Sequence, residues 1–107
     1  MTGENVVAAI SGAGLPICHM AWPVGSAPKL PWCVFYLNED VTLYADDAPY
    51  ADRAEWCVEL YCKPDDADSA PKVERALREG FGNFTKSEAW VEDQGCLQTS
   101  YVFDEIR

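Results

Sequence analysis

Basic residues, histidine and long apolar runs are all scarce in this sequence. Of its 107 residues only 8 are Lys or Arg, against 18 Asp or Glu, so the formal net charge is -10. This balance disfavours binding to nucleic acid or to an anionic membrane, because both depend on clustered Lys and Arg. No apolar run reaches the ~18 residues of a membrane span, and the N-terminus lacks the basic region of a signal peptide. We therefore expect a soluble, unprocessed protein that binds neither nucleic acid nor a membrane directly.

Motifs for metals and cofactors are also missing. Cys57 and Cys62 would lie on opposite faces of one strand, and no Cys-x-x-Cys pair exists that could clasp zinc. The acidic stretch that starts at Asp66 has Pro71 where a calcium-binding loop needs glycine, and no glycine-rich loop has phosphate-binding spacing. The sequence therefore predicts no metal and no cofactor. An odd number of cysteines without an export signal favours reduced, buried thiols at Cys18, Cys33, Cys57, Cys62 and Cys96.

Groups that could carry catalysis are few. His19 is the only histidine, and its neighbour Cys18 would point to the other face of an extended segment, so the two cannot form a Cys-His pair. A thiol enzyme using Cys18 or Cys57 is disfavoured, because no basic cluster is present to lower a thiol pKa. We expect no catalytic residues and a protein that is not an enzyme.

Length and apolar content predict one folded domain over residues 1–107. Hydrophobic residues make up 49% and aromatic residues 12% of the chain, which supports a packed core at a length that suits a single one. Periodicity and chain-breaking residues then predict the elements. They are a helix at 2–13, an edge strand at 15–22, a stiff proline-rich loop at 23–31, a strand at 32–38, a short extended piece at 41–44, a turn region at 45–52, a strand at 54–62, a helix at 70–79, and a closing hairpin of 84–92 and 96–106.

Local signals mark the ends of several elements. Thr2 is the expected N-cap of the first helix, and Asp68 or Ser69 that of the second. Gly80 is expected to end the second helix, and Gly95 to take a positive φ in the closing turn.

These elements predict an α+β fold. The order α-β-β-β-α-β-β favours a single mostly antiparallel sheet of four to five strands, packed against two helices on one face. Glu74 and Arg78 form an i,i+4 pair on the second helix.

Aromatic residues offer a possible contact surface. Trp56, Val58 and Leu60 alternate along the strand at 54–62 and form its apolar face. Tyr61 points away from that face, whereas Tyr44 and Tyr50 fall in loop-like sequence flanked by acids. This composition favours binding to a protein partner. An equally good interpretation is that these rings close a second core face under a loop.

Three short motifs stand out in the sequence. They are Gly-x-Ala-Pro-x-Leu-Pro (Gly25, Ala27, Pro28, Leu30, Pro31), Tyr44-Ala45-Asp46 with Tyr50, and Glu59-Leu60-Tyr61 before an acidic capped helix. Together they resemble a family of small phage and prophage proteins from the head-to-tail gene module, the tail completion or tail terminator proteins. The resemblance covers residues 15–77 well and the final hairpin loosely, and Cys62 departs from it, so it assigns nothing to the thiols.

The resemblance implies a structural role in the virion tail, in a protein made in the cytoplasm of a bacterial host. Such proteins form a ring, usually a hexamer, that caps the tail tube and joins it to the head connector, and DNA passes through the ring lumen. Self-association and contacts with tail-tube and head-completion proteins are therefore expected, through the loops at 23–31 and 46–52. The interface residues predicted on this basis are Pro28, Leu30, Tyr44, Asp46, Asp47, Tyr50 and Tyr61.

The charge alone allows a second function. Carboxylates can imitate DNA phosphates, so the chain could be an acidic decoy that occupies a nucleic-acid-binding host protein. A decoy would be monomeric or dimeric with one continuous acidic face, whereas a tail protein would form rings.

Overall fold

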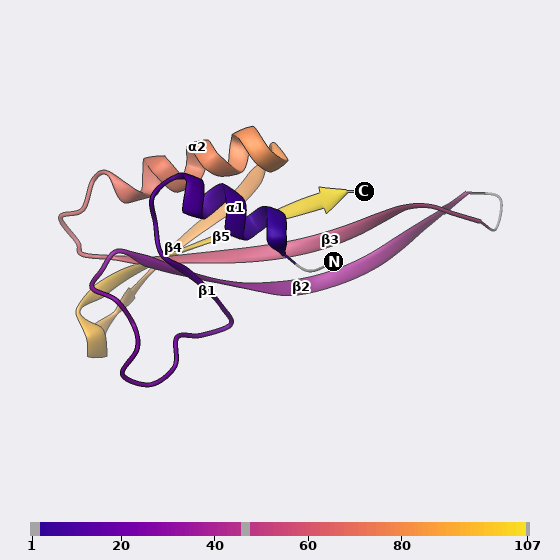
Figure 1. The fold of residues 1–107 in the computed structure, drawn as a ribbon. Coiled ribbons are helices and arrows are strands. Elements are labelled where there is room, and N and C mark those ends of the chain that lie inside the picture. The colour runs from indigo at the N-terminus through magenta and orange to yellow at the C-terminus, as the bar shows by residue number, and fades with distance from the viewer. Residues whose placement is uncertain (1–2, 46–47, 107) are drawn as a thin grey trace.

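Two helices lie on one face of a five-stranded sheet (Figure 1). The structure is a computed structural model that describes the backbone of residues 3–45 and 48–106, and the side chains of residues 3–40 and 53–106. The predicted α+β class and element order are confirmed. The elements are α1 (Glu4–Gly12), β1 (Ile17–His19), β2 (Trp32–Ala45), β3 (Ala48–Cys62), α2 (Ser69–Phe81), β4 (Phe84–Val91), a short 3-10 helix (Glu92–Gln94) and β5 (Cys96–Ile106).

The strands follow the order β1-β2-β3-β5-β4 across the sheet. Every neighbouring pair is antiparallel except β1 and β2, which are parallel. A parallel pair needs a connection that returns along the sheet. Residues 20–31 make this return on the face opposite the helices (Figure 1). The chain leaves β1 at Met20, whose φ of 66° lies in the left-handed region.

The core fills the space between the sheet and the helices. The predicted alternation on β3 is confirmed, since Trp56, Val58 and Leu60 are almost fully buried on the helix side. Burial of these side chains supplies the main driving force for folding, because each removes a large apolar surface from water. The helices contribute Val6, Ile10, Val73 and Leu77 to the same cluster, and β5 adds Tyr101 and Phe103.

The N-terminus of α2 is capped by a residue that the sequence patterns did not select. The side chain of Asp68, at the N-cap position, makes no capping hydrogen bond. Instead the Asp66 carboxylate accepts hydrogen bonds from the backbone N–H groups of Asp68 (3.0 Å) and Ser69 (3.1 Å) and from the Ser69 hydroxyl (2.6 Å). The prediction of Asp68 as N-cap is therefore confirmed for its position, but the capping side chain is that of Asp66, because the turn before the helix brings Asp66 back over its first N–H groups.

We expect Asp66→Ala to lower the free energy of unfolding by about 1 kcal/mol, the usual cost of a lost cap, and Asp68→Ala by less than about 0.5 kcal/mol. The hydrogen bond from the Ser69 hydroxyl lowers the pKa of Asp66, with help from two backbone N–H groups and against burial. A lowered folded-state pKa means that the stabilisation is present above the ordinary pKa of the carboxyl and is lost as the pH falls through the folded value. Urea denaturation at pH 7 and below pH 3 measures both effects. Equal losses for the two variants at pH 7 would contradict this assignment.

Other differences concern the ends of elements. The predicted N-cap Thr2 lies outside the described residues, and α1 begins after Gly3. Helix α2 runs on through Gly80 to Phe81 and is ended by Gly82, so the prediction of Gly80 as C-cap was wrong. The prediction for Gly95 is confirmed, with a φ of 59°.

The largest error concerns residues 41–52. The short extended piece predicted at 41–44 is the continuation of β2, which runs from Trp32 to Ala45. The turn region predicted at 45–52 is mostly strand, because β3 begins at Ala48. Antiparallel pairing with the facing strand overrides the turn-forming tendency of the Asp, Ala and Pro residues in this segment.

Candidate assembly surfaces

The most prominent surface feature is a two-stranded arm. Pairing of β2 with β3 continues to Ala45 and Ala48, whereas β5 pairs with β3 only as far as Arg53. On the other side, β1 covers β2 only at Cys33, Val34 and Phe35. Residues 41–45 and 48–52 therefore extend beyond the sheet, with no further strand on either edge in the part of the chain that the structure describes (Figure 1). The arm accounts for the elongated shape, 51 Å by 27 Å by 23 Å.

Charged side chains lie at the root of the arm, which is the point where β2 and β3 leave the rest of the sheet. The Arg53 guanidinium lies 3.4 Å from the Glu39 carboxylate and 3.7 Å from that of Asp104, so it links β2, β3 and β5. All three side chains are substantially exposed, and pairs of this kind contribute little to stability.

A buried carboxylate lies on the helix side of this root. Glu105 is only 7% exposed. It accepts hydrogen bonds from the Trp56 indole N–H (3.2 Å) and from the Asn5 side-chain amide (2.6 Å). A single side chain of β5 thereby joins β3 to the first turn of α1.

Next to the root, β5 runs past the start of β4. Phe84 pairs with Phe103, so the edge of β5 from Asp104 to Ile106 faces no β4 residue. A recess of about 600 Å³ lies beside this unpaired edge of β5. Ile106 lines it and is 64% exposed. An open edge beside an exposed apolar side chain is suited to accept a strand from another chain.

The proline-rich loop forms a second surface at the opposite end of β2 (Figure 1). Trp32 stacks on Tyr61 with ring centroids 4.5 Å apart and meets Trp22 of the loop edge-on at 6.3 Å. These aromatic contacts hold the loop against the sheet beside a recess of about 370 Å³. The Trp22 indole N–H is buried without a hydrogen-bond partner among the described residues. At the tip of the loop, Val24 is fully exposed.

The predicted interface residues fall into two separate groups. Pro28 and Leu30 lie half-buried in the loop, and Tyr61 packs beneath it as part of the aromatic stack. The backbones of Tyr44 and Tyr50 belong to the two strands of the arm, and their side chains lie outside the described set. Asp46 and Asp47 also lie outside the described residues. The loop and the arm thus occupy opposite ends of the β2–β3 hairpin (Figure 1).

The thiols are poorly suited to nucleophilic chemistry. Burial, with a smaller contribution from nearby Cys62, raises the pKa of Cys33 to about 12. Burial also raises the pKa of Cys57, Cys62 and Cys96, so these groups stay protonated at neutral pH. The Cys18 thiol donates to the carbonyl oxygen of Ala21 at 3.3 Å. Among the side chains of residues 3–40 and 53–106, no group of His, Cys, Asp or Glu is arranged to hold a metal ion.

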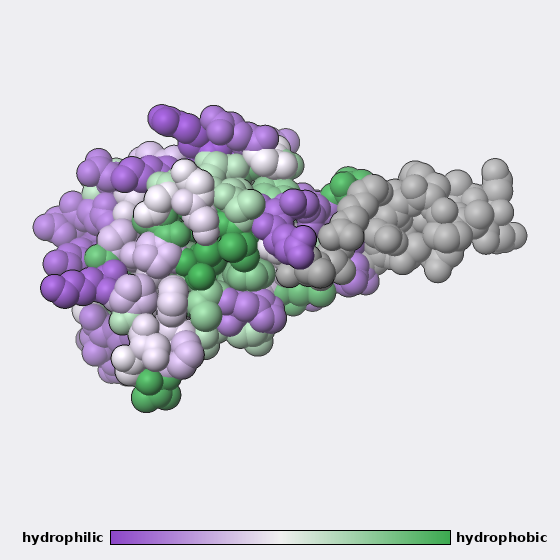
Figure 2. Space-filling model, in the orientation of Figure 1, coloured by the Kyte–Doolittle hydropathy of each residue, from purple (hydrophilic) through white to green (hydrophobic). Residues whose placement is uncertain are grey.

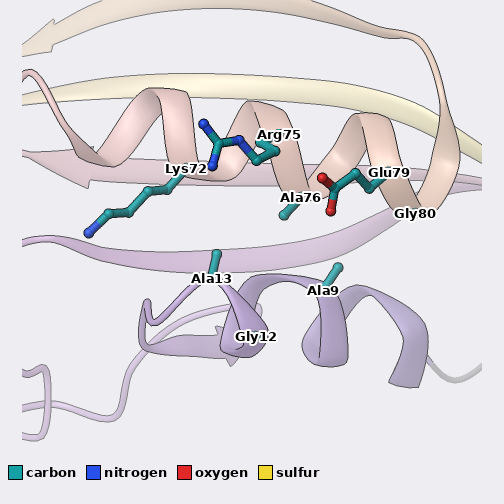
Figure 3. Close-up of a pocket in the computed structure, with 8 residues that line it drawn as sticks. All are labelled: Ala9, Gly12, Ala13, Lys72, Arg75, Ala76, Glu79 and Gly80. Atoms are coloured by element: carbon teal, nitrogen blue, oxygen red, sulfur yellow. The ribbon is translucent and has the colours of Figure 1, made fainter.

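A groove of about 610 Å³ separates the two helices on the outside of the molecule (Figure 3). Small residues of both helices line this groove, and their size allows the helices to approach closely. Lys72, Arg75 and Glu79 of α2 line its other side, and hydrophilic residues cover the outer surface of α2 (Figure 2). The small residues are Ala9, Gly12 and Ala13 of α1 with Ala76 and Gly80 of α2.

No protein-family model matches this chain, and no curated protein is significantly similar to it. In the described part of the chain, no helix combines the length and apolar character that crossing a membrane would require.

Proposed function

We propose that this chain is a non-enzymatic phage or prophage tail protein, which caps the tail tube and joins it to the head connector as a ring. The proposal is supported by the sequence motifs that resemble the tail completion and tail terminator proteins, and by the arm. The arm is the single observation that carries it, because a two-stranded extension beyond the rest of the sheet offers two free edges to other chains.

A ring requires two different surfaces on each subunit, one complementary to the other. The arm of one subunit reaches the next, and the open edge of β5 with its recess beside Ile106 receives it. The contact is head to tail, so it repeats until the ring closes.

The charge of the chain suits a passage for DNA. With a net charge of -10 on each subunit, a lumen lined by carboxylates repels the phosphate backbone and leaves the genome free to slide.

Light scattering over a range of concentrations, with divalent salt to screen the charge, tests the ring. We expect a species near six times 11.9 kDa or a whole multiple of it. In the matched variant, an Asn-Gly turn replaces residues 43–51 between the paired Thr42 and Asp52, which shortens the arm without disturbing the register. This variant is expected to melt within a few degrees of the wild type and to form no ring.

Two results would overturn the proposal. A wild-type chain that never exceeds the mass of a dimer under these conditions would favour the acidic decoy. A shortened-arm variant that still forms rings would show that the arm does not join the subunits.

A further inference from the structure

The outer edge of β4 is the second free edge of the molecule. Strand β4 is the last in the sheet and pairs with β5 without interruption from Phe84 to Val91. Its other edge faces no strand in the described part of the chain. All of its residues are exposed except the two half-buried ends. A regular, unpaired edge of this length is a template for another strand unless it is protected.

The order of side chains along β4 is self-complementary. Phe84, Lys86, Glu88 and Trp90 share the helix side of the sheet, opposite Phe103, Tyr101, Thr99 and Leu97 of β5. Their order is aromatic, basic, acidic, aromatic, with Ser87 at the centre. When two copies of such a strand run antiparallel about Ser87, each residue faces the one that lies equally far on the other side of the centre.

This pairing brings opposite charges together. Lys86 lies opposite the partner's Glu88, and Glu88 opposite the partner's Lys86. Within one chain the Lys86 ammonium already lies 3.0 Å from the Glu74 carboxylate and 3.7 Å from that of Glu88. These two contacts hold the Lys86 side chain over the strand, and the partner's Glu88 would be a third carboxylate beside its charge. Opposite charges in directly facing positions stabilise an antiparallel pair, and like charges destabilise it.

The same pairing covers the exposed aromatic ring of the strand. Trp90 is 54% exposed at the end of β4. In the antiparallel pair it lies opposite the partner's Phe84. Phe84 is held in place by an edge-on contact with Tyr101 (5.3 Å between ring centroids) and by the Arg78 guanidinium (5.0 Å from its ring). Aromatic pairs across strands add to the stability of a sheet.

We propose that β4 is a self-association edge: two copies of the chain pair antiparallel through β4, with Ser87 on the two-fold axis, to form one continuous sheet. The dimer leaves the arm free, because β2 and β3 do not contact β4 in the strand order. It uses the outer edge of β4, whereas the proposed ring uses the edge of β5 at residues 104–106, and Phe84 and Thr85 lie where the two surfaces meet. Where both contacts form, two rings are joined through their β4 strands.

Charge reversal tests the pairing, with the dissociation constant of the dimer measured by sedimentation at salt concentrations of about 0.15 M and above, where repulsion between the acidic chains is screened. Lys86→Glu and Glu88→Lys each place like charges opposite one another, and we expect each to weaken the dimer at least tenfold. The double variant Lys86→Glu/Glu88→Lys restores opposite charges and should return the constant to within about threefold of the wild type. Thermal melting checks that each variant is folded, since Lys86→Glu also removes the contact with Glu74.

Cross-linking tests the register. Oxidation of Ser87→Cys is expected to give a disulfide-linked dimer, because the two copies of residue 87 face each other on the axis. Thr85→Cys is the matched control on the same face. Its two copies would lie about 14 Å apart along the strands and should not cross-link above the wild-type level. A wild-type protein without dimers, a double variant as weak as the single ones, or cross-linking of both cysteine variants alike would overturn the proposal. Loss of the ring in the shortened-arm variant, with the β4 dimer retained, separates the two contacts.

Discussion

Replacement of Glu105 by alanine is expected to lower the free energy of unfolding by about 2–4 kcal/mol. The substitution removes the acceptor for the Trp56 indole N–H, which is buried where water cannot replace the lost bond. It also removes the bond from Asn5 that holds the first turn of α1, and it leaves a cavity in the core. Urea denaturation monitored by tryptophan fluorescence measures the loss.

Two further variants identify the cause. Asp104→Ala removes a carboxylate from the neighbouring position, where it is exposed and lies 3.7 Å from Arg53, so a cost below about 1 kcal/mol is expected. Glu105→Gln keeps the size of the side chain but replaces one acceptor oxygen by an NH₂ group, so it should cost about half as much as Glu105→Ala. If Asp104→Ala were as damaging as Glu105→Ala, the buried hydrogen bonds would not be the reason.

Gly3→Ala is expected to destabilise the fold by about 2–3 kcal/mol. Gly3 has a φ of 78°, in the region that side chains rarely adopt. A Cβ atom at this position would lie 2.6 Å from Cε2 of Phe35 and 3.2 Å from the Trp56 ring. Both rings are buried and cannot turn away, so the start of α1 would have to shift. Circular dichroism during thermal melting follows the change.

Gly12→Ala provides the control in the same helix. It is the last residue of α1, and a Cβ atom added there would meet no atom within 4 Å outside its own helix and chain neighbours. Alanine is the better helix former, so this variant should be stabilised by about 0.5–1 kcal/mol. We therefore expect Gly3→Ala to destabilise the fold and Gly12→Ala, at the other end of α1, to stabilise it. A small effect of Gly3→Ala would mean that the N-terminus of the helix can move without cost.

Gly3 and Glu105 both lie close to the root of the arm. Gly3 and Asn5 bring the first turn of α1 against Phe35, Trp56 and Glu105, where β2, β3 and β5 lie side by side. The arm starts next to this region, where the sheet contacts the first turn of α1.

Local signals were sufficient for most of the fold. Alternation along β3 placed Trp56 and its neighbours in the core, Gly95 marked the closing turn, and the predicted Glu74 to Arg78 pair is present at 4.0 Å. Each of these features depends on residues close together in the sequence.

The sequence by itself determined the α+β class, the order of the elements, the buried apolar face of β3, and the acidic charge. Only the tertiary structure decided the parallel pairing of β1 with β2, the cap from Asp66, the burial of Glu105 against Trp56 and Asn5, and the length of the arm. The reason is physical. Periodicity and chain-breaking residues act over a few neighbours, whereas strand pairing and buried hydrogen bonds join segments that lie far apart along the chain. The segment at 45–52 shows the difference, because its residues favour turns and only its partner strand makes most of it a β-strand.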